Sequence, residues 1–206
     1  MKAITLVLIL MSWVAGAQSK FETGMQKALA LWGENKTGEA SALFERIAAA
    51  EPDQWLPNYY LAMVNATASF QTRDKEAVSA YLTRAQQAVD VEMAKDDKNP
   101  ELYVVQALVY TAWIVSDPMV HAMVYSPKAM EAYQKAEMLA PDNPRVVFGK
   151  AEFEMGTARY FGKDVKPMCE QVNRAIALFK AEKPQSPLYP AWGLERALMV
   201  QQECNK

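Results

Sequence analysis

Two segments of this chain, far apart in the sequence, share one helical pattern that ends at a proline. In each, a small residue, an aromatic residue and an apolar residue stand at offsets 0, +4 and +7, and proline follows at +12. The matched residues are Ala40, Phe44, Ile47 and Pro52 in the first segment and Ala129, Tyr133, Ala136 and Pro141 in the second. Residues three and four apart share a helix face and proline cannot continue a helix, so each segment predicts a helix that buries this stripe and stops. A recurring unit of this kind is typical of stacked helical hairpins, each of which buries its apolar face against its neighbours.

Proline and glycine divide the rest of the chain into further expected helices. Asn99 and Asn143 are each followed by proline, which is a strong signal for a helix N-terminus. Ser126-Pro127 and Tyr189-Pro190 predict two more starts by the same reasoning, and they leave Val115 to Ser126 as a long connection. The β-branched residues occur singly inside helical patterns, so the sequence predicts about nine helices, no strands and an all-α fold.

Residues 1–17 have the pattern of a secretory signal peptide. A positive start precedes an apolar run over residues 4–14, and the small residues 15–17 form a cleavage box. The apolar run is too short to span a bilayer. Because no cysteine follows the cleavage box, we expect a cleaved signal without a lipid anchor and a periplasmic or secreted mature chain over residues 18–206.

The charge balance limits the class of partner. The chain carries 22 basic and 24 acidic side chains, for a formal net charge of −2. Nucleic-acid binders normally present a basic face, so we expect no nucleic-acid partner. No segment after the signal is apolar enough to cross a membrane, and we expect no membrane insertion.

The two cysteines predict a structural disulfide. Cys169 and Cys204 both lie in the part of the chain expected to be exported, where an even pair is usually oxidised. Their spacing lacks the close C-x-x-C arrangement of a redox-active pair. A disulfide between them would stabilise the fold by about 3–4 kcal/mol in the chain-entropy treatment.

The repeated pattern resembles the tetratricopeptide repeat (TPR), a helical hairpin with small and aromatic residues at fixed positions and a proline after its second helix. The matching residues are Ala28, Ala40, Phe44 and Pro52 in a first unit and Tyr103, Ala107, Tyr110, Ala129, Tyr133, Ala136 and Pro141 in a third. Three further segments, residues 15–22, 31–36 and 189–193, resemble small exported TPR proteins of the Bacteroidetes type. The resemblance implies a right-handed stack of about four hairpins with a C-terminal capping helix over about residues 187–205, in a single domain over residues 18–206. It implies no reaction.

Signatures of catalysis are missing from the sequence. It contains no H-E-x-x-H, no G-x-S-x-G, no glycine-rich phosphate loop and no acidic calcium loop. A nucleophile that needs histidine would depend on His121, the single histidine of the chain. We therefore expect no enzyme, no cofactor and no metal site. An enzyme or small-molecule binder with a pocket between the hairpins remains the alternative hypothesis.

The TPR resemblance implies that the first helix of each hairpin lines a concave face, where a peptide segment or partner protein would bind. On that register the candidate partner-binding residues are Met25, Trp32, Tyr59, Met63, Leu108, Arg145, Phe148 and Glu152. Methionine and aromatic side chains suit an apolar or amphipathic partner, although each of them is equally compatible with a place in the hairpin core. The connection from Val115 to Ser126, which contains His121, is a second candidate as a binding lip. A purely structural subunit of an envelope assembly is a third hypothesis, and it predicts an exposed apolar patch.

Overall fold

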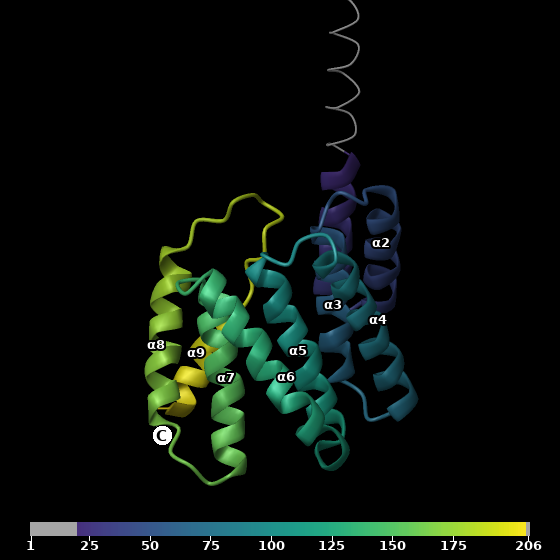
Figure 1. Ribbon diagram of the computed structural model, residues 1–206. Helices are drawn as coiled ribbons and strands as arrows, with labels where there is room; N and C mark the ends of the chain where they lie inside the picture. Colours follow the sequence, from purple (N-terminus) through teal and green to yellow (C-terminus); the bar gives the residue numbers. More distant parts are fainter. Residues whose placement is uncertain (1–19, 205–206) are drawn as a thin grey trace, which may run out of the picture.

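The computed structural model describes residues 20–204 as a stack of helices without strands (Figure 1). A helical stretch over residues 20–33 is followed by eight further helices in this part of the chain. These are α2 (Thr37–Ala50), α3 (Leu56–Ser69), α4 (Lys75–Met93), α5 (Pro100–Ser116), α6 (Pro118–Leu139), α7 (Pro144–Tyr160), α8 (Lys166–Ala181) and α9 (Leu194–Cys204). The signal peptide predicted over residues 1–17 lies outside the described residues.

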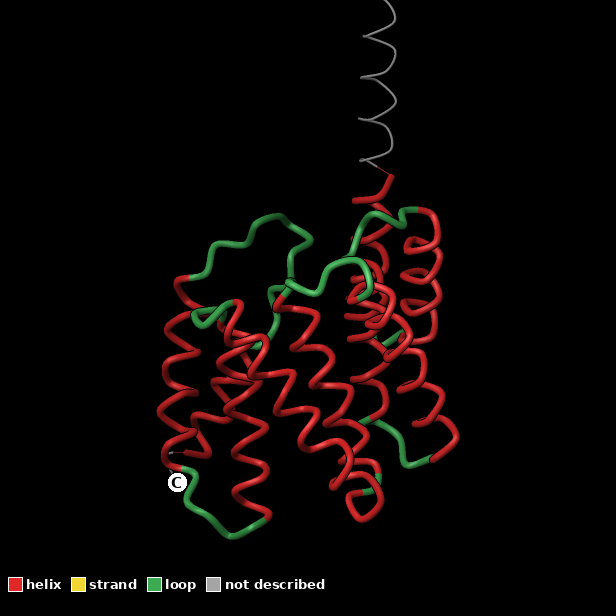
Figure 2. The backbone as a smooth tube through the Cα atoms, viewed as in Figure 1, coloured by secondary structure: helices red, strands yellow, loops and turns green. Residues whose placement is uncertain are grey.

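The helices pair into four antiparallel hairpins: residues 20–33 with α2, α3 with α4, α5 with α6, and α7 with α8. Short loops join most of these helices, and one long loop joins α8 to α9 (Figure 2). The last helix, α9, packs on α8 and closes the stack. The predicted all-α stack of about four hairpins with a C-terminal closing helix is confirmed.

The repeated stripe forms the inside of two of these hairpins. All three stripe residues of α2 are buried, and so are Ala129, Tyr133 and Ala136 of α6. Tyr133 lies directly against Gly149 of α7, where a Cβ atom would stand 2.8 Å from the tyrosine Cε1. Glycine at position 149 therefore lets the large ring of one hairpin enter the surface of the next.

Two of the predicted helix starts are capped as expected. The side chain of Asn99 accepts a hydrogen bond from the backbone N–H of Glu101 at 3.0 Å, and that of Asn143 accepts one from the N–H of Arg145 at 2.9 Å. Each cap satisfies an N–H group that has no partner within its own helix. The caps also place Glu101 and Arg145 in the first turns of α5 and α7, at the same end of two neighbouring helices.

The other two predicted starts are wrong. Pro127 lies inside α6, which begins at Pro118, so the predicted long connection from Val115 to Ser126 is mostly helix. Pro127 cannot donate to the carbonyl group four residues earlier, but the stacked rings of Trp113 and Tyr125 hold the preceding turns against α5. Tyr189-Pro190 begins no helix either, because α9 starts at Leu194.

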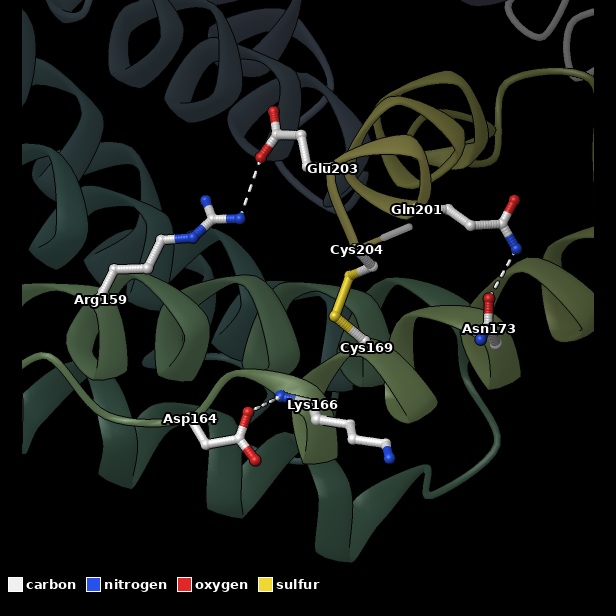
Figure 3. Close-up of a disulfide and its surroundings, with 8 residues drawn as sticks. All are labelled: Arg159, Asp164, Lys166, Cys169, Asn173, Gln201, Glu203 and Cys204. Atoms are coloured by element: carbon white, nitrogen blue, oxygen red, sulfur yellow. Dashed lines mark hydrogen bonds and ion pairs between the residues drawn. A yellow bond between two sulfur atoms is a disulfide. The ribbon is translucent and has the colours of Figure 1, made fainter. Parts of the chain in front are cut away.

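The predicted disulfide is confirmed, and it joins α8 to α9. Figure 3 shows Cys169 near the start of α8 and Cys204 at the end of α9. On either side of the disulfide, Arg159 pairs with Glu203 at 3.0 Å, and Gln201 donates to Asn173 at 2.6 Å (Figure 3). The closing helix is thus attached to the last hairpin covalently as well as by packing.

Within residues 20–204, no helix combines the length and the apolar character that a membrane span requires.

Candidate functional site

The structure buries most of the residues that the sequence placed on an open concave face. The five buried side chains, each at most 3% exposed, are Met25, Tyr59, Met63, Arg145 and Phe148. Trp32, Leu108 and Glu152 are half-buried. The predicted exposure of the first five is therefore wrong, because neighbouring helices and one other segment of the chain cover them.

That segment is the loop between α8 and α9, residues 182–193, which we call the strap (Figure 1). The hydroxyl of Tyr60 donates to the backbone carbonyl of Leu188 at 2.9 Å, and Trp192 Nε1 donates to the Tyr59 hydroxyl at 2.7 Å. Both bonds join α3 to residues about 130 positions later in the sequence. The strap therefore crosses from the last hairpin to the N-terminal half of the stack.

Side-chain packing adds to these two bonds. The ring of Tyr189 lies edge-on to Trp55 with centroids 6.1 Å apart, and the Arg145 guanidinium lies over the same tyrosine ring at 5.6 Å. Leu188 is buried in the main apolar core formed by the N-terminal hairpins. The strap thus completes the core at the face where the first helices of the hairpins meet.

Three charged residues form a cluster that joins the strap to the helices beneath it. Arg145 Nε donates to both carboxylate oxygens of Glu101, at 2.8 and 3.0 Å, and its terminal nitrogens donate to Glu182 of the strap. Asn143 also donates to Glu101, at 2.7 Å. The side chains of Glu101 and Arg145 are fully buried, whereas that of Glu182 is 20% exposed. Each buried charge therefore has a partner, as the low dielectric of the interior requires.

This environment shifts the pKa values of the neighbouring groups. Burial raises the pKa of Glu101 above its usual range, and the pairing with Arg145 opposes that shift. Burial lowers the pKa of Arg145, but its bonds to Glu182 and Glu101 outweigh this effect, and the net pKa is raised. Burial also raises the pKa of Tyr60 to about 12. The tyrosines at this face therefore stay neutral and act as hydrogen-bond donors and acceptors.

A shallow pocket of about 290 Å³ opens beside the charged cluster, between the start of α7, the end of α8 and the strap. Its lining includes Asn143, Leu178, Glu182, Lys183 and Tyr189. These side chains contain no nucleophile paired with a base. No group of three or more histidine, cysteine, aspartate or glutamate side chains with metal-binding geometry occurs in the described part of the chain.

A different surface stands out at the turn between α5 and α6, the lower end of that hairpin in Figure 1. Five large apolar side chains are exposed there, and we call them the tip patch: Val115, Met119, Val120, Met123 and Val124. Met119 is 88% exposed and Met123 is 92% exposed. Such side chains are normally covered, so a contiguous exposed group marks a candidate interaction surface.

An aromatic cluster lies between α5 and α6 at the same end of the hairpin as the tip patch. The rings of Trp113 and Tyr125 stack with centroids 5.9 Å apart, and His121 lies edge-on to both, at 5.2 and 5.6 Å. Lys128 Nζ lies 5.5 Å from the centre of the Tyr125 ring. His121, which the sequence marked as part of a candidate binding lip, therefore belongs to a stacked cluster at the helical tip and not to a loop.

Sequence reasoning missed the strap and its role. The segment contains Pro184, Pro187 and Pro190, which interrupt any helical pattern, and it carries Tyr189 and Trp192 close together. An aromatic pair in a stretch that cannot be helical indicates side chains that must be buried elsewhere in the molecule. That signal identifies the segment, but it does not identify the face that the segment covers.

Two solved structures are similar to this chain. The HusA haemophore from Porphyromonas gingivalis aligns over 89% of this chain and 91% of its own, with a TM-score of 0.70 and 21% identity. TTC0263, a thermophilic TPR protein of Thermus thermophilus, aligns over 90% of this chain and 98% of its own, with a TM-score of 0.58 and 13% identity. Neither a protein-family model nor a curated protein sequence matches the chain. The likeness is one of fold, and the fold is TPR-like, as the sequence predicted.

Proposed function

We propose that this protein is a non-catalytic binding module that holds a partner protein through an apolar or amphipathic segment of that partner. The observation that carries the proposal is the tip patch, in which Met119 and Met123 are almost fully exposed. Because five of the residues predicted for the concave face are buried, two of them under the strap, we propose the tip patch as the surface for an external partner. Trp32, Leu108 and Glu152 are half-buried, and their predicted partner-binding roles stay a separate part of the proposal.

The chemistry of the tip patch fits an apolar partner surface. Met119 and Met123 are four residues apart and therefore lie on one side of α6, one turn from each other. Methionine side chains repack easily around different apolar shapes, and the stacked rings of Trp113 and Tyr125 hold this part of α6 against α5. A partner helix or extended segment with apolar side chains would cover this surface.

The test is affinity capture from envelope extract with two matched variants. In the first, Met119→Ser and Met123→Ser remove the exposed thioethers of the tip patch. The control is Met138→Ser, which removes a methionine that is 77% exposed near the other end of α6. We expect one specific partner to be lost with the first variant and kept with the control. Capture that is the same for wild type and both variants would reject the tip patch as the binding surface.

A second candidate function is the binding of haem as cargo. The observation that favours it is the fold similarity to the HusA haemophore over 89% of this chain. The tip also offers His121, beside Trp113 and Tyr125, as an imidazole near flat aromatic rings. Haem titration followed by the Soret absorbance tests this function, with His121→Ala as the variant. Saturable binding that the variant weakens supports it, whereas absorbance identical to that of free haem rejects it.

We also propose that the mature protein is exported. The signal pattern over residues 1–17 and the disulfide between Cys169 and Cys204 support this location, because disulfides persist in oxidising compartments. Mass spectrometry of the protein from its native host tests the proposal. A mature chain beginning near residue 18 with no free thiol is the expected result, and an intact N-terminus would refute cleavage.

A further inference from the structure

We propose that the surface beneath the strap is a second binding site, for an extended peptide that carries a carboxylate and aromatic side chains. This surface, which we call the face, consists of Trp55, Tyr59, Tyr60, Glu101 and Arg145. The strap occupies the face in the structure and would compete with the peptide for it. This site is independent of the tip patch. The strap bonds to α3 and to the first turn of α7 and packs against the N-terminal part of α5, whereas the tip patch lies at the opposite end of α5. The two proposals can therefore fail separately.

The carboxylate requirement comes from Arg145. Its guanidinium is fully buried and divides its donors between Glu101, which belongs to the face, and Glu182, which belongs to the strap. If the strap left the face, Arg145 would keep its bond to Glu101 and lose its partner on the other side. A buried guanidinium needs a carboxylate there, so the face selects an occupant with an acidic group.

The aromatic requirement comes from three side chains of the face. Tyr59 accepts the indole N–H of Trp192, and Trp55 packs edge-on against Tyr189. Tyr60 donates to a backbone carbonyl of the strap, and any extended peptide presents such a carbonyl. These contacts would recognise an extended peptide by one backbone carbonyl and two aromatic side chains, as in other modes of peptide recognition.

The strap has little internal structure of its own. It contains no helix or strand, and the only backbone hydrogen bond within it joins the N–H of Tyr189 to the carbonyl of Ser186 at 3.1 Å. Residues 183–187 are mostly exposed. The strap is therefore placed mainly by the side chains of the face, and these are the same side chains that an external peptide would use.

Both ends of the strap are anchored. It runs from the end of α8 to α9, and the disulfide between Cys169 and Cys204 joins these two helices. Gly193 makes the turn into α9 with φ of +113°, and a Cβ atom there would stand 2.5 Å from Phe179 Cζ. The strap is thus held close to the face at high effective concentration. An external peptide binds only the fraction of molecules in which the strap is displaced, which weakens its apparent affinity by that fraction.

The experiment measures binding of a fluorescent synthetic peptide with the sequence of residues 182–193. It compares the wild type with the variant Tyr189→Ser/Trp192→Ser, in which the strap loses both aromatic contacts. We expect the variant to bind the peptide at least about tenfold more tightly than the wild type does. Two control peptides, one with serine for the tyrosine and tryptophan and one with glutamine for the glutamate, should lose this binding.

A second measurement covers the case in which the variant does not fold. A protease site is placed within residues 183–187, and the protein is cut after folding, so that the disulfide retains the C-terminal fragment. The wild-type side chains stay in place, but the strap has lost one anchor, and the nicked protein should bind the peptide more tightly than the uncut protein. Equal, weak binding by the folded variant or by the nicked protein, with no difference between the matched and control peptides, would overturn the proposal.

Discussion

The buried pair of Arg145 and Glu101 makes the most demanding prediction for stability. Replacing Arg145 with methionine removes its charged contacts to both glutamates and leaves the carboxylate of Glu101, which is 0% exposed, with Asn143 as its remaining donor. Removing one partner of a buried ion pair costs about 3–5 kcal/mol, because the other charge stays desolvated. We therefore expect Arg145→Met to lower the free energy of unfolding by about 3–5 kcal/mol.

The double variant Glu101→Gln/Arg145→Met separates the lost pairing from the lost packing. Glutamine carries no charge, so the double variant should be more stable than Arg145→Met alone by about 1–3 kcal/mol. The assay is urea unfolding followed by circular dichroism. It compares the wild type, Arg145→Met, Glu101→Gln and the double variant. Glu182→Gln is the matched control, since Glu182 is part-exposed and its loss leaves the pair intact. We expect the control to cost less than Arg145→Met, because the pair of Arg145 and Glu101 stays in place and the glutamine oxygen can still accept a bond from the guanidinium.

The pH dependence of Arg145→Met provides a further check. Burial already raises the pKa of Glu101, and removal of the arginine raises it further. The folded state then binds a proton more tightly than the unfolded state, so the stability of this variant should rise as the pH falls from neutral toward the ordinary glutamate pKa. The double variant has no carboxylate at position 101 and should lack this rise. A loss below about 1 kcal/mol for Arg145→Met, or the same pH slope in both variants, would refute the reasoning.

Three other outcomes follow from the structure. Reducing the Cys169–Cys204 disulfide should lower the free energy of unfolding by about 3–4 kcal/mol in the chain-entropy treatment; an unchanged melting temperature after complete reduction would contradict this. Stability should fall between pH 10 and pH 12, because Tyr60 ionises near pH 10 when unfolded but at about 12 when folded, and Tyr60→Phe should lose less stability over that interval. Tyr133→Ala should cost about 3–5 kcal/mol by opening a cavity against Gly149, as measured by denaturant unfolding; a near-neutral result would contradict the assigned packing.

Much of the fold could be predicted because its determinants are local. The two stripes of small and aromatic residues, one with Phe44 and one with Tyr133, are buried as expected. Asn99 and Asn143 cap the helices that they were predicted to start. Ser126-Pro127 has the same local pattern but lies within α6. The difference lies in the tertiary contacts. The turns before Pro127 pack on α5, and such contacts override a local sequence signal.

The candidate site was harder to predict from the sequence, because it depends on contacts between residues that are far apart in the chain. The TPR resemblance predicted Tyr59 and Arg145 on an open face of the first helices, whereas the structure buries both side chains in α3 and α7. It could not show that Glu182 and Trp192 cover them, since no local pattern pairs residue 59 with residue 192. The tip patch lies within the segment from Val115 to Ser126 that the sequence marked as a candidate binding lip. Its helical form was not predicted, because that segment was expected to be a connection.

The bond between Tyr59 and Trp192 also determines the order in which the molecule can be completed. The four hairpins are built from contacts between neighbours in the sequence, and such contacts form early and fast. The bond joins residues separated by 133 positions, so the inner face of α3 stays uncovered until nearly the whole chain is present. During synthesis from the N-terminus, the first hairpins therefore fold with their aromatic face open, and the last residues of the chain close it.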